Sequence, residues 1–86
     1  MYKKEMVIKN ETGLHARPAS DLTVLCQKFE SDIKLISSQA IINPKSIISI
    51  LAGGFAQGTA FTLQVEGADE EKAGEEIERY INELKE

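Results

Sequence analysis

The 86-residue sequence is poor in residues that build disulfides or metal centres: it has one cysteine, Cys26, and one histidine, His15. A single cysteine cannot form an internal disulfide, which favours a reducing compartment. One histidine and one cysteine are too few for a typical zinc site, so we expect no metal and no other cofactor. Cys26 falls on an apolar helical stripe, where we expect a small core residue and not a nucleophile.

Tryptophan, basic clusters and long apolar runs are missing as well. No apolar run approaches the ~18 residues that a membrane helix needs. Residues 1–5 lack the apolar segment of a signal peptide. The net charge is −4 and no basic stripe is present, which argues against a nucleic-acid partner. We therefore expect a cytoplasmic protein that neither inserts into a membrane nor binds nucleic acid.

The length and the apolar periodicity predict a single domain over residues 1–86 in which strands and helices alternate. The expected strands are 2–9, 33–36, 40–42 and 61–66, and the expected helices are 16–28, 47–51 and a last helix after residue 69. This order, βαββαβα, predicts an α+β layer with an antiparallel sheet that is open on one face and covered by three helices on the other. Asp69 is expected to cap the last helix, and Gly74 inside that helix is expected to permit close packing.

The histidine lies where a turn changes into a helix, in residues 13–20, GLHARPAS. A helix start presents unpaired N–H groups and the positive end of the helix dipole, which stabilise a bound anion. A neutral imidazole at that place can attack a phosphoryl group, and Arg17 supplies donors that fit phosphate oxygens. Pro18 suits the first turn because its missing N–H has no helical partner to lose. The residue types leave a second interpretation equally open, a surface histidine that only caps the helix.

The eight-residue motif resembles the active-site motif of HPr, the histidine-containing phosphocarrier family of the bacterial phosphoenolpyruvate:sugar phosphotransferase system. The resemblance extends over the whole chain and implies an open-faced sandwich with a four-stranded antiparallel sheet. It implies that His15 is phosphorylated on Nδ1, that Arg17 balances the phosphate charge, and that the N–H groups of Ala16 and Arg17 face the phosphate oxygens. The donor would be enzyme I and the acceptors enzyme II A domains. The protein would be a phosphoryl carrier without turnover of its own, and a small acidic carrier that exchanges partners is expected to be a monomer.

A second segment, residues 43–48, resembles the regulatory serine region of the same family. In many Gram-positive members this serine is phosphorylated by HPr kinase/phosphorylase, and the modified form binds catabolite control protein A. The resemblance assigns this role to Ser46, although the residues alone favour an ordinary serine N-cap. The segment departs from the family pattern at Pro44, Ile48, Ser49 and Gly53, where the family usually has leucine, methionine, glycine and leucine. Carrier chemistry at the intact histidine motif is therefore the safer inference.

The short helix of residues 47–51 cannot bury all of its apolar side chains. The exposed ones are expected to form a docking patch near the histidine, with two residues of the preceding helix on its rim. The expected docking residues are Ile47, Ile48, Leu51, Arg17 and Ser20. Entry of most of the apolar residues into the core is the alternative, given equal weight.

Three functions follow from these observations, and the phosphocarrier is favoured. The second is a regulatory binding module that acts through the Ser46 surface, by docking to a kinase, a repressor or an enzyme. The presence of His15 argues against a purely regulatory role, because such a module has no need of an imidazole. The third is an unrelated α+β adaptor with a chance motif, which a buried His15 would support.

Overall fold

The computed structural model describes residues 1–84 and contains four strands and three helices in the expected order. The strands are β1 (Tyr2–Val7), β2 (Asp32–Ser37), β3 (Ile41–Ile42) and β4 (Ala60–Glu66), and the helices are α1 (Ala16–Gln27), α2 (Ile47–Ala52) and α3 (Glu70–Asn82). Within that part of the chain, no helix has both the length and the apolar character needed to cross a membrane.

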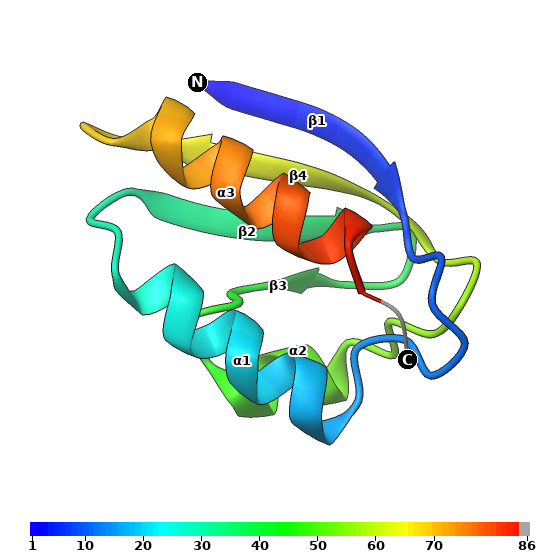
Figure 1. Cartoon of the computed structure of the whole chain (residues 1–86). Coiled ribbons are helices and arrows are strands. Elements are labelled where there is room, and N and C mark those ends of the chain that lie inside the picture. The colour runs from blue at the N-terminus through cyan, green and yellow to red at the C-terminus, as the bar shows by residue number, and fades with distance from the viewer. Residues whose placement is uncertain (85–86) are drawn as a thin grey trace.

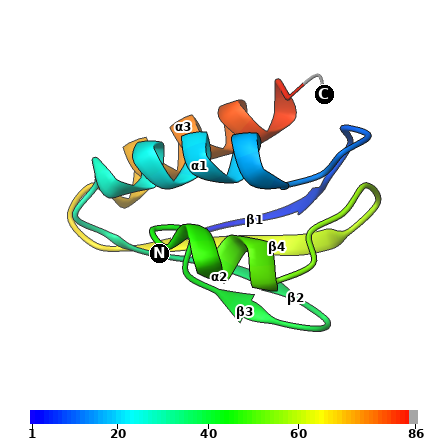
Figure 2. The same cartoon turned by 90° about the horizontal axis from the view of Figure 1, so that it is seen from below.

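One antiparallel sheet holds the strands in the order β1-β4-β2-β3. The central strand β4 buries Phe61, Leu63 and Val65 on one face, and Met6 of β1 lies opposite Phe61. The three helices lie on that face, and the other face of the sheet is open (Figures 1 and 2). The open-faced α+β sandwich is therefore confirmed; β1 ends at Val7, two residues before the expected end.

The core lies between the sheet and the helices, and α1 contributes the stripe that its spacing predicts. Ala19, Leu22 and Cys26 are fully buried, and Phe29 directly follows this helix region as a further core residue. Burial raises the pKa of the Cys26 thiol to about 12, so the thiol is un-ionised at neutral pH. Cys26 is thus a core residue, as the sequence predicts.

The close packing expected at Gly74 is confirmed. A Cβ atom on Gly74 would lie 2.3 Å from Cδ1 of Tyr2, so the tyrosine ring of β1 occupies the space that a side chain would need. The Tyr2 hydroxyl donates to Glu78 Oε1 one turn later on α3, and Lys4 Nζ lies 3.8 Å from Glu78 Oε2. These contacts fix α3 against β1.

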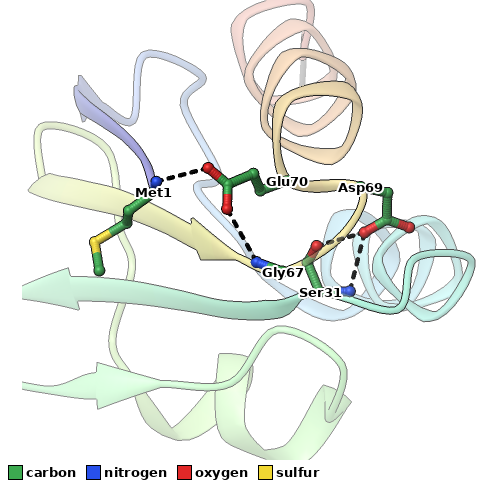
Figure 3. A network of polar contacts seen from close by, with 5 residues as sticks. All are labelled: Met1, Ser31, Gly67, Asp69 and Glu70. Carbon is green, nitrogen blue, oxygen red and sulfur yellow. Dashed lines mark hydrogen bonds and ion pairs between the residues drawn. The ribbon is translucent and has the colours of Figure 1, made fainter.

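Asp69 stands at the N-cap position of α3, but its side chain does not cap the helix, and that part of the prediction is wrong. Its carboxylate accepts hydrogen bonds from the N–H groups of Glu30 and Ser31, both at 3.0 Å, and from Ser31 Oγ. Figure 3 shows the bonds to Ser31. Ser31 is buried, so its polar groups need a protein partner, whereas the amides of an exposed helix start can bind water. The Ser31 hydroxyl, with the two backbone donors, holds the pKa of Asp69 below its usual value.

Glu70 ties the same corner to the start of the chain (Figure 3). Its Oε2 lies 2.6 Å from the Met1 ammonium nitrogen, and its Oε1 accepts the N–H of Gly67 at 3.1 Å. The hydrogen bond to the ammonium group lowers the pKa of Glu70. The two carboxylates that begin α3 therefore join it to β1 and to the loop before β2.

Candidate functional site

A tight turn delivers the chain to His15. Gly13 has a φ of +65°, a value that favours glycine, and its N–H donates to Asn10 O at 3.2 Å. The buried Asn10 side chain closes the same turn, because Nδ2 donates to Gly13 O at 2.9 Å. The Leu14 N–H then donates to Phe55 O at 2.8 Å. The residues before His15 are thereby fixed to the loop that follows α2.

His15 itself is the N-cap residue of α1. Its backbone is extended, with φ −88° and ψ −166°, and its carbonyl oxygen accepts the Ala19 N–H at 2.8 Å. The imidazole makes no capping hydrogen bond and is exposed, as is the Arg17 side chain. The ring is therefore not used to close the helix, and its exposure argues against the unrelated adaptor.

The first turn of α1 leaves two backbone donors for an anion. Ala16 and Arg17 occupy the first two helical positions, whose N–H groups have no partner within a helix. Pro18 has no N–H, and the Ala19 N–H is bonded to His15. Within residues 1–84, the N–H groups of this turn that remain free are therefore those of Ala16 and Arg17, next to the positive end of a twelve-residue helix.

The Arg17 guanidinium is available to an anion at the same place. None of the carboxylates in residues 1–84 forms an ion pair with it. Across those residues there is also no group of three or more His, Cys, Asp or Glu side chains that would hold a metal ion. The site thus combines one exposed imidazole, one exposed guanidinium and two backbone N–H groups, a set suited to a phosphoryl group.

A shallow hollow of about 250 Å³ lies beside His15. It is lined by the turn before α1 and by the end of α2 with its following loop: Thr12, Leu14, His15, Leu51, Gly54, Phe55 and Ala56. Leu51 therefore shares a surface with His15, as the sequence suggested. Phe55 was missed, because the glycine pair before it marks a turn without indicating what that turn packs against.

The apolar side chains of α2 divide between the core and the solvent. Ile48 is 75% exposed and Leu51 is 48% exposed, whereas Ile47 is half-buried and packs against the core. On α1, Ser20 is exposed and Val24, one turn later, is 58% exposed. The two alternatives, exposure in a patch and entry into the core, therefore each hold for part of α2. Val24 is an exposed apolar residue that the sequence reasoning did not single out.

Ser46 is the N-cap residue of α2, as predicted. Its Oγ accepts the Ser49 N–H at 3.3 Å, and Ser49 Oγ in turn accepts the Asn43 N–H at 3.0 Å. Ser49 stands where the family pattern has glycine, so its hydroxyl adds a hydrogen bond that the glycine would not make. Pro44 between these residues is fully buried. Two of the departures from the family pattern therefore stiffen the approach to Ser46.

The Ser46 segment lies at the end of α1 that is remote from His15. Lys45 Nζ donates to Phe29 O at 2.8 Å, and Gln27 Nε2 donates to Lys45 O at 3.1 Å. With twelve residues and a rise of 1.5 Å per residue, the two ends of α1 are roughly 18 Å apart. The end of α2, where Leu51 lies, approaches His15, and the beginning of α2 does not. Figure 2 shows α1 and α2 in one view.

Comparisons with known proteins agree with this geometry. The family model "PTS HPr component phosphorylation site" matches residues 2–83. The phosphocarrier protein HPr of Mycoplasma pneumoniae is 42% identical over 74 residues, which cover 85% of this chain and 84% of that protein. The crystal structure of HPr-C-His from Thermoanaerobacter tengcongensis matches with a TM-score of 0.90 and 39% identity, covering 95% of this chain and 92% of its own.

A further similar structure is that of Crh, a catabolite repression protein of Bacillus subtilis, described as an intertwined dimer with a swapped domain. It is 31% identical, with a TM-score of 0.76, and the match covers 100% of this chain and 99% of Crh. The proteins similar to this chain therefore include a catabolite repression protein as well as phosphocarrier proteins.

Proposed function

Because this chain belongs to the HPr family, the phosphocarrier proteins of the bacterial phosphotransferase system, we propose that His15 accepts a phosphoryl group from phospho-enzyme I and passes it to enzyme II A domains. The observation that carries the proposal is the exposed, uncapped imidazole at the start of α1, beside Arg17 and two free amides. The protein acts in this relay as a carrier without turnover of its own.

In the proposed phosphoryl transfer, His15 is the nucleophile, and Ala16 and Arg17 stabilise the charge of the phosphate. Nδ1 of a neutral His15 attacks phosphorus, a new N–P bond forms, and the bond from phosphorus to the donor breaks. The N–H groups of Ala16 and Arg17 and the Arg17 guanidinium then offset the charge on the phosphate oxygens. All of these groups lie at the surface, so the phosphate is held modestly and can leave again, as a relay requires.

The proposal is tested by incubating the protein with enzyme I and radiolabelled phosphoenolpyruvate. Wild type should take up label that is labile in acid, and His15→Ala should take up none. Arg17→Ala should be labelled more slowly, by at least about tenfold, which matches the loss of one charge-assisted contact of about 1.5 kcal/mol. Absence of label in wild type would refute the proposal.

A regulatory role for Ser46 is the second part of the proposal. The serine is exposed, and a phosphate on an N-cap position adds negative charge where a helix tolerates it. HPr kinase/phosphorylase is the expected kinase, and catabolite control protein A the expected partner of the modified form. With the kinase and ATP, wild type should gain acid-stable phosphate and Ser46→Ala none. A Ser49→Gly variant, which removes the added hydrogen bond, should be phosphorylated faster than wild type.

The alternative function is a regulatory module that acts mainly through the Ser46 surface. It is favoured by the departures at Pro44 and Ser49 and by the likeness to Crh. The two functions are separated by a pair of variants in the host. Sugar uptake that depends on His15 supports the carrier, whereas partner capture that depends on Ser46, with uptake independent of His15, supports the module. In either role we infer a monomer in the cytoplasm, which meets its partners by diffusion.

A further inference from the structure

The first turn of α1 is held by a residue from the far end of the chain. The Tyr80 hydroxyl of α3 donates to Pro18 O at 3.2 Å, across 62 residues of sequence. Tyr80 is half-buried and lies beside Ile81 and one turn after Ile77, both of which are buried. Because these two neighbours anchor α3 in the core, the direction of the Tyr80 ring is set by the packing of the fold.

This bond is continued by a second one that ends on His15. Pro18 O belongs to the same peptide unit as the Ala19 N–H, and that N–H donates to His15 O at 2.8 Å. The series therefore runs from the Tyr80 hydroxyl through the Pro18–Ala19 peptide to the His15 carbonyl. Hydrogen bonds in series polarise one another, so the outer bond strengthens the inner one.

His15 is thus held on both sides while its ring stays exposed. On the upstream side, the Asn10–Gly13 turn and the bond from Leu14 to the loop after α2 fix the chain. On the downstream side, α3 reaches the first turn through Tyr80. A reacting atom displaced by about 1 Å can slow a reaction by about 100-fold, so small shifts of this turn are expected to register in the rate.

We propose that Tyr80 is a positioning residue for phosphoryl transfer at His15. The inference rests on the proposed carrier function and adds to it a residue of α3 that bonds the backbone of the first turn of α1. It acts through the Pro18–Ala19 peptide, by keeping the N-cap residue and the two free amides in one fixed arrangement.

The test compares Tyr80→Phe with Tyr2→Phe. Each change removes one hydroxyl that makes a hydrogen bond and keeps the ring, and each tyrosine is half-buried. The Tyr2 hydroxyl bonds Glu78 on α3 and not the backbone of α1, so Tyr2→Phe controls for the general loss of a tyrosine hydroxyl. Phosphorylation is measured with phospho-enzyme I over a range of carrier concentrations, and separately with potassium phosphoramidate, which needs no protein partner. Urea unfolding confirms that each variant is folded in the assay.

With phospho-enzyme I as the donor, we expect Tyr80→Phe to lower the kcat of phosphoryl transfer to the carrier by about three- to tenfold and to leave the KM for the carrier within about twofold. Labelling by phosphoramidate should be slower as well. Tyr2→Phe should stay within about 1.5-fold of wild type in both assays. A Tyr80→Phe rate equal to wild type, an effect confined to KM, or an equal loss in Tyr2→Phe would overturn the inference. Any of these three outcomes would refute the role of Tyr80 and leave the carrier function intact. Failure of wild type to take up phosphate on His15 would refute both the role of Tyr80 and the carrier function.

Discussion

Gly13 offers a sharp test of how the turn before His15 is built. Gly13 and Gly54 have nearly the same left-handed backbone, with φ of +65° and +68°. An alanine at either position suffers the same backbone strain, about 1–2 kcal/mol. The surroundings differ: apart from its own chain neighbours, a Cβ on Gly54 has no atom within 4 Å, whereas a Cβ on Gly13 would lie 2.3 Å from Phe55 O and 2.7 Å from Ala56 Cα.

The atoms that Gly13→Ala would strike are backbone atoms, which cannot swing away as a side chain can. The contact of 2.3 Å must open by at least about 0.7 Å to reach 3.0 Å, the shortest spacing that real Cβ atoms show. That movement separates the Leu14 N–H from Phe55 O, its partner at 2.8 Å. An unsatisfied buried donor costs about 1–3 kcal/mol. We therefore expect Gly13→Ala to lower the free energy of unfolding by about 2–5 kcal/mol and Gly54→Ala to lower it by about 1–2 kcal/mol.

Urea unfolding at 25 °C, followed by circular dichroism, measures both free energies of unfolding. The expected difference between the two variants is about 1–3 kcal/mol, which is the contribution of the lost Leu14 hydrogen bond, and it is read from the shift of the urea midpoint. The folded fraction of Gly13→Ala should also be phosphorylated more slowly, because the turn that carries His15 has moved. Equal losses in the two alanine variants would refute the argument that the Phe55 loop fixes this turn.

Three further predictions concern the packing and the charges elsewhere in the fold. Asp69→Asn should destabilise the protein most at neutral pH. Because the pKa of Asp69 is lowered in the folded state, the carboxylate stabilises the fold above its unfolded-state pKa, and this stabilisation is lost as the pH falls through the folded-state pKa. The unfolding curves of variant and wild type should therefore converge in acid, and a difference that stays constant with pH would contradict this. Gly74→Ala should destabilise the protein by about 1 kcal/mol because the new methyl group displaces the Tyr2 ring. In a Tyr2→Ala background the same change should stabilise the protein by about 1 kcal/mol, because alanine favours a helix more than glycine does. Additive effects of the two changes in this double-mutant cycle would count against the close contact. The Cys26 thiol, whose pKa burial raises to about 12, should react with a disulfide reagent at pH 8 only after unfolding, and rapid reaction of the native protein would be inconsistent with its burial.

The elements of the fold were within reach of the sequence because each one carries its own periodicity. The alternation of Phe61, Leu63 and Val65 identifies β4, and the spacing of Ala19, Leu22 and Cys26 identifies α1. Both patterns reflect burial on one face, which depends on near neighbours in the sequence. The histidine motif is local as well, so the exposed imidazole at the helix start followed from it.

Contacts between distant segments were out of reach for the opposite reason. Asp69 has the residue type and position of a helix cap, but the buried donors of Ser31, 38 residues away, take its carboxylate instead. Phe55 and Tyr80 support the His15 turn from the loop after α2 and from α3, and nothing in their own neighbourhoods marks those partners. A pattern in one segment states which face is apolar, and the packed structure decides what that face meets.

The central claim, that His15 carries a transferable phosphoryl group, is tested most directly by locating the modification. The protein is incubated with enzyme I and phosphoenolpyruvate, digested at neutral pH, and mapped by mass spectrometry. We predict an added mass of about 80 Da, labile in acid, on the peptide that contains His15, and its loss when an enzyme II A domain is added. A peptide that stays unmodified, or a phosphate that maps only to Ser46, would contradict the account.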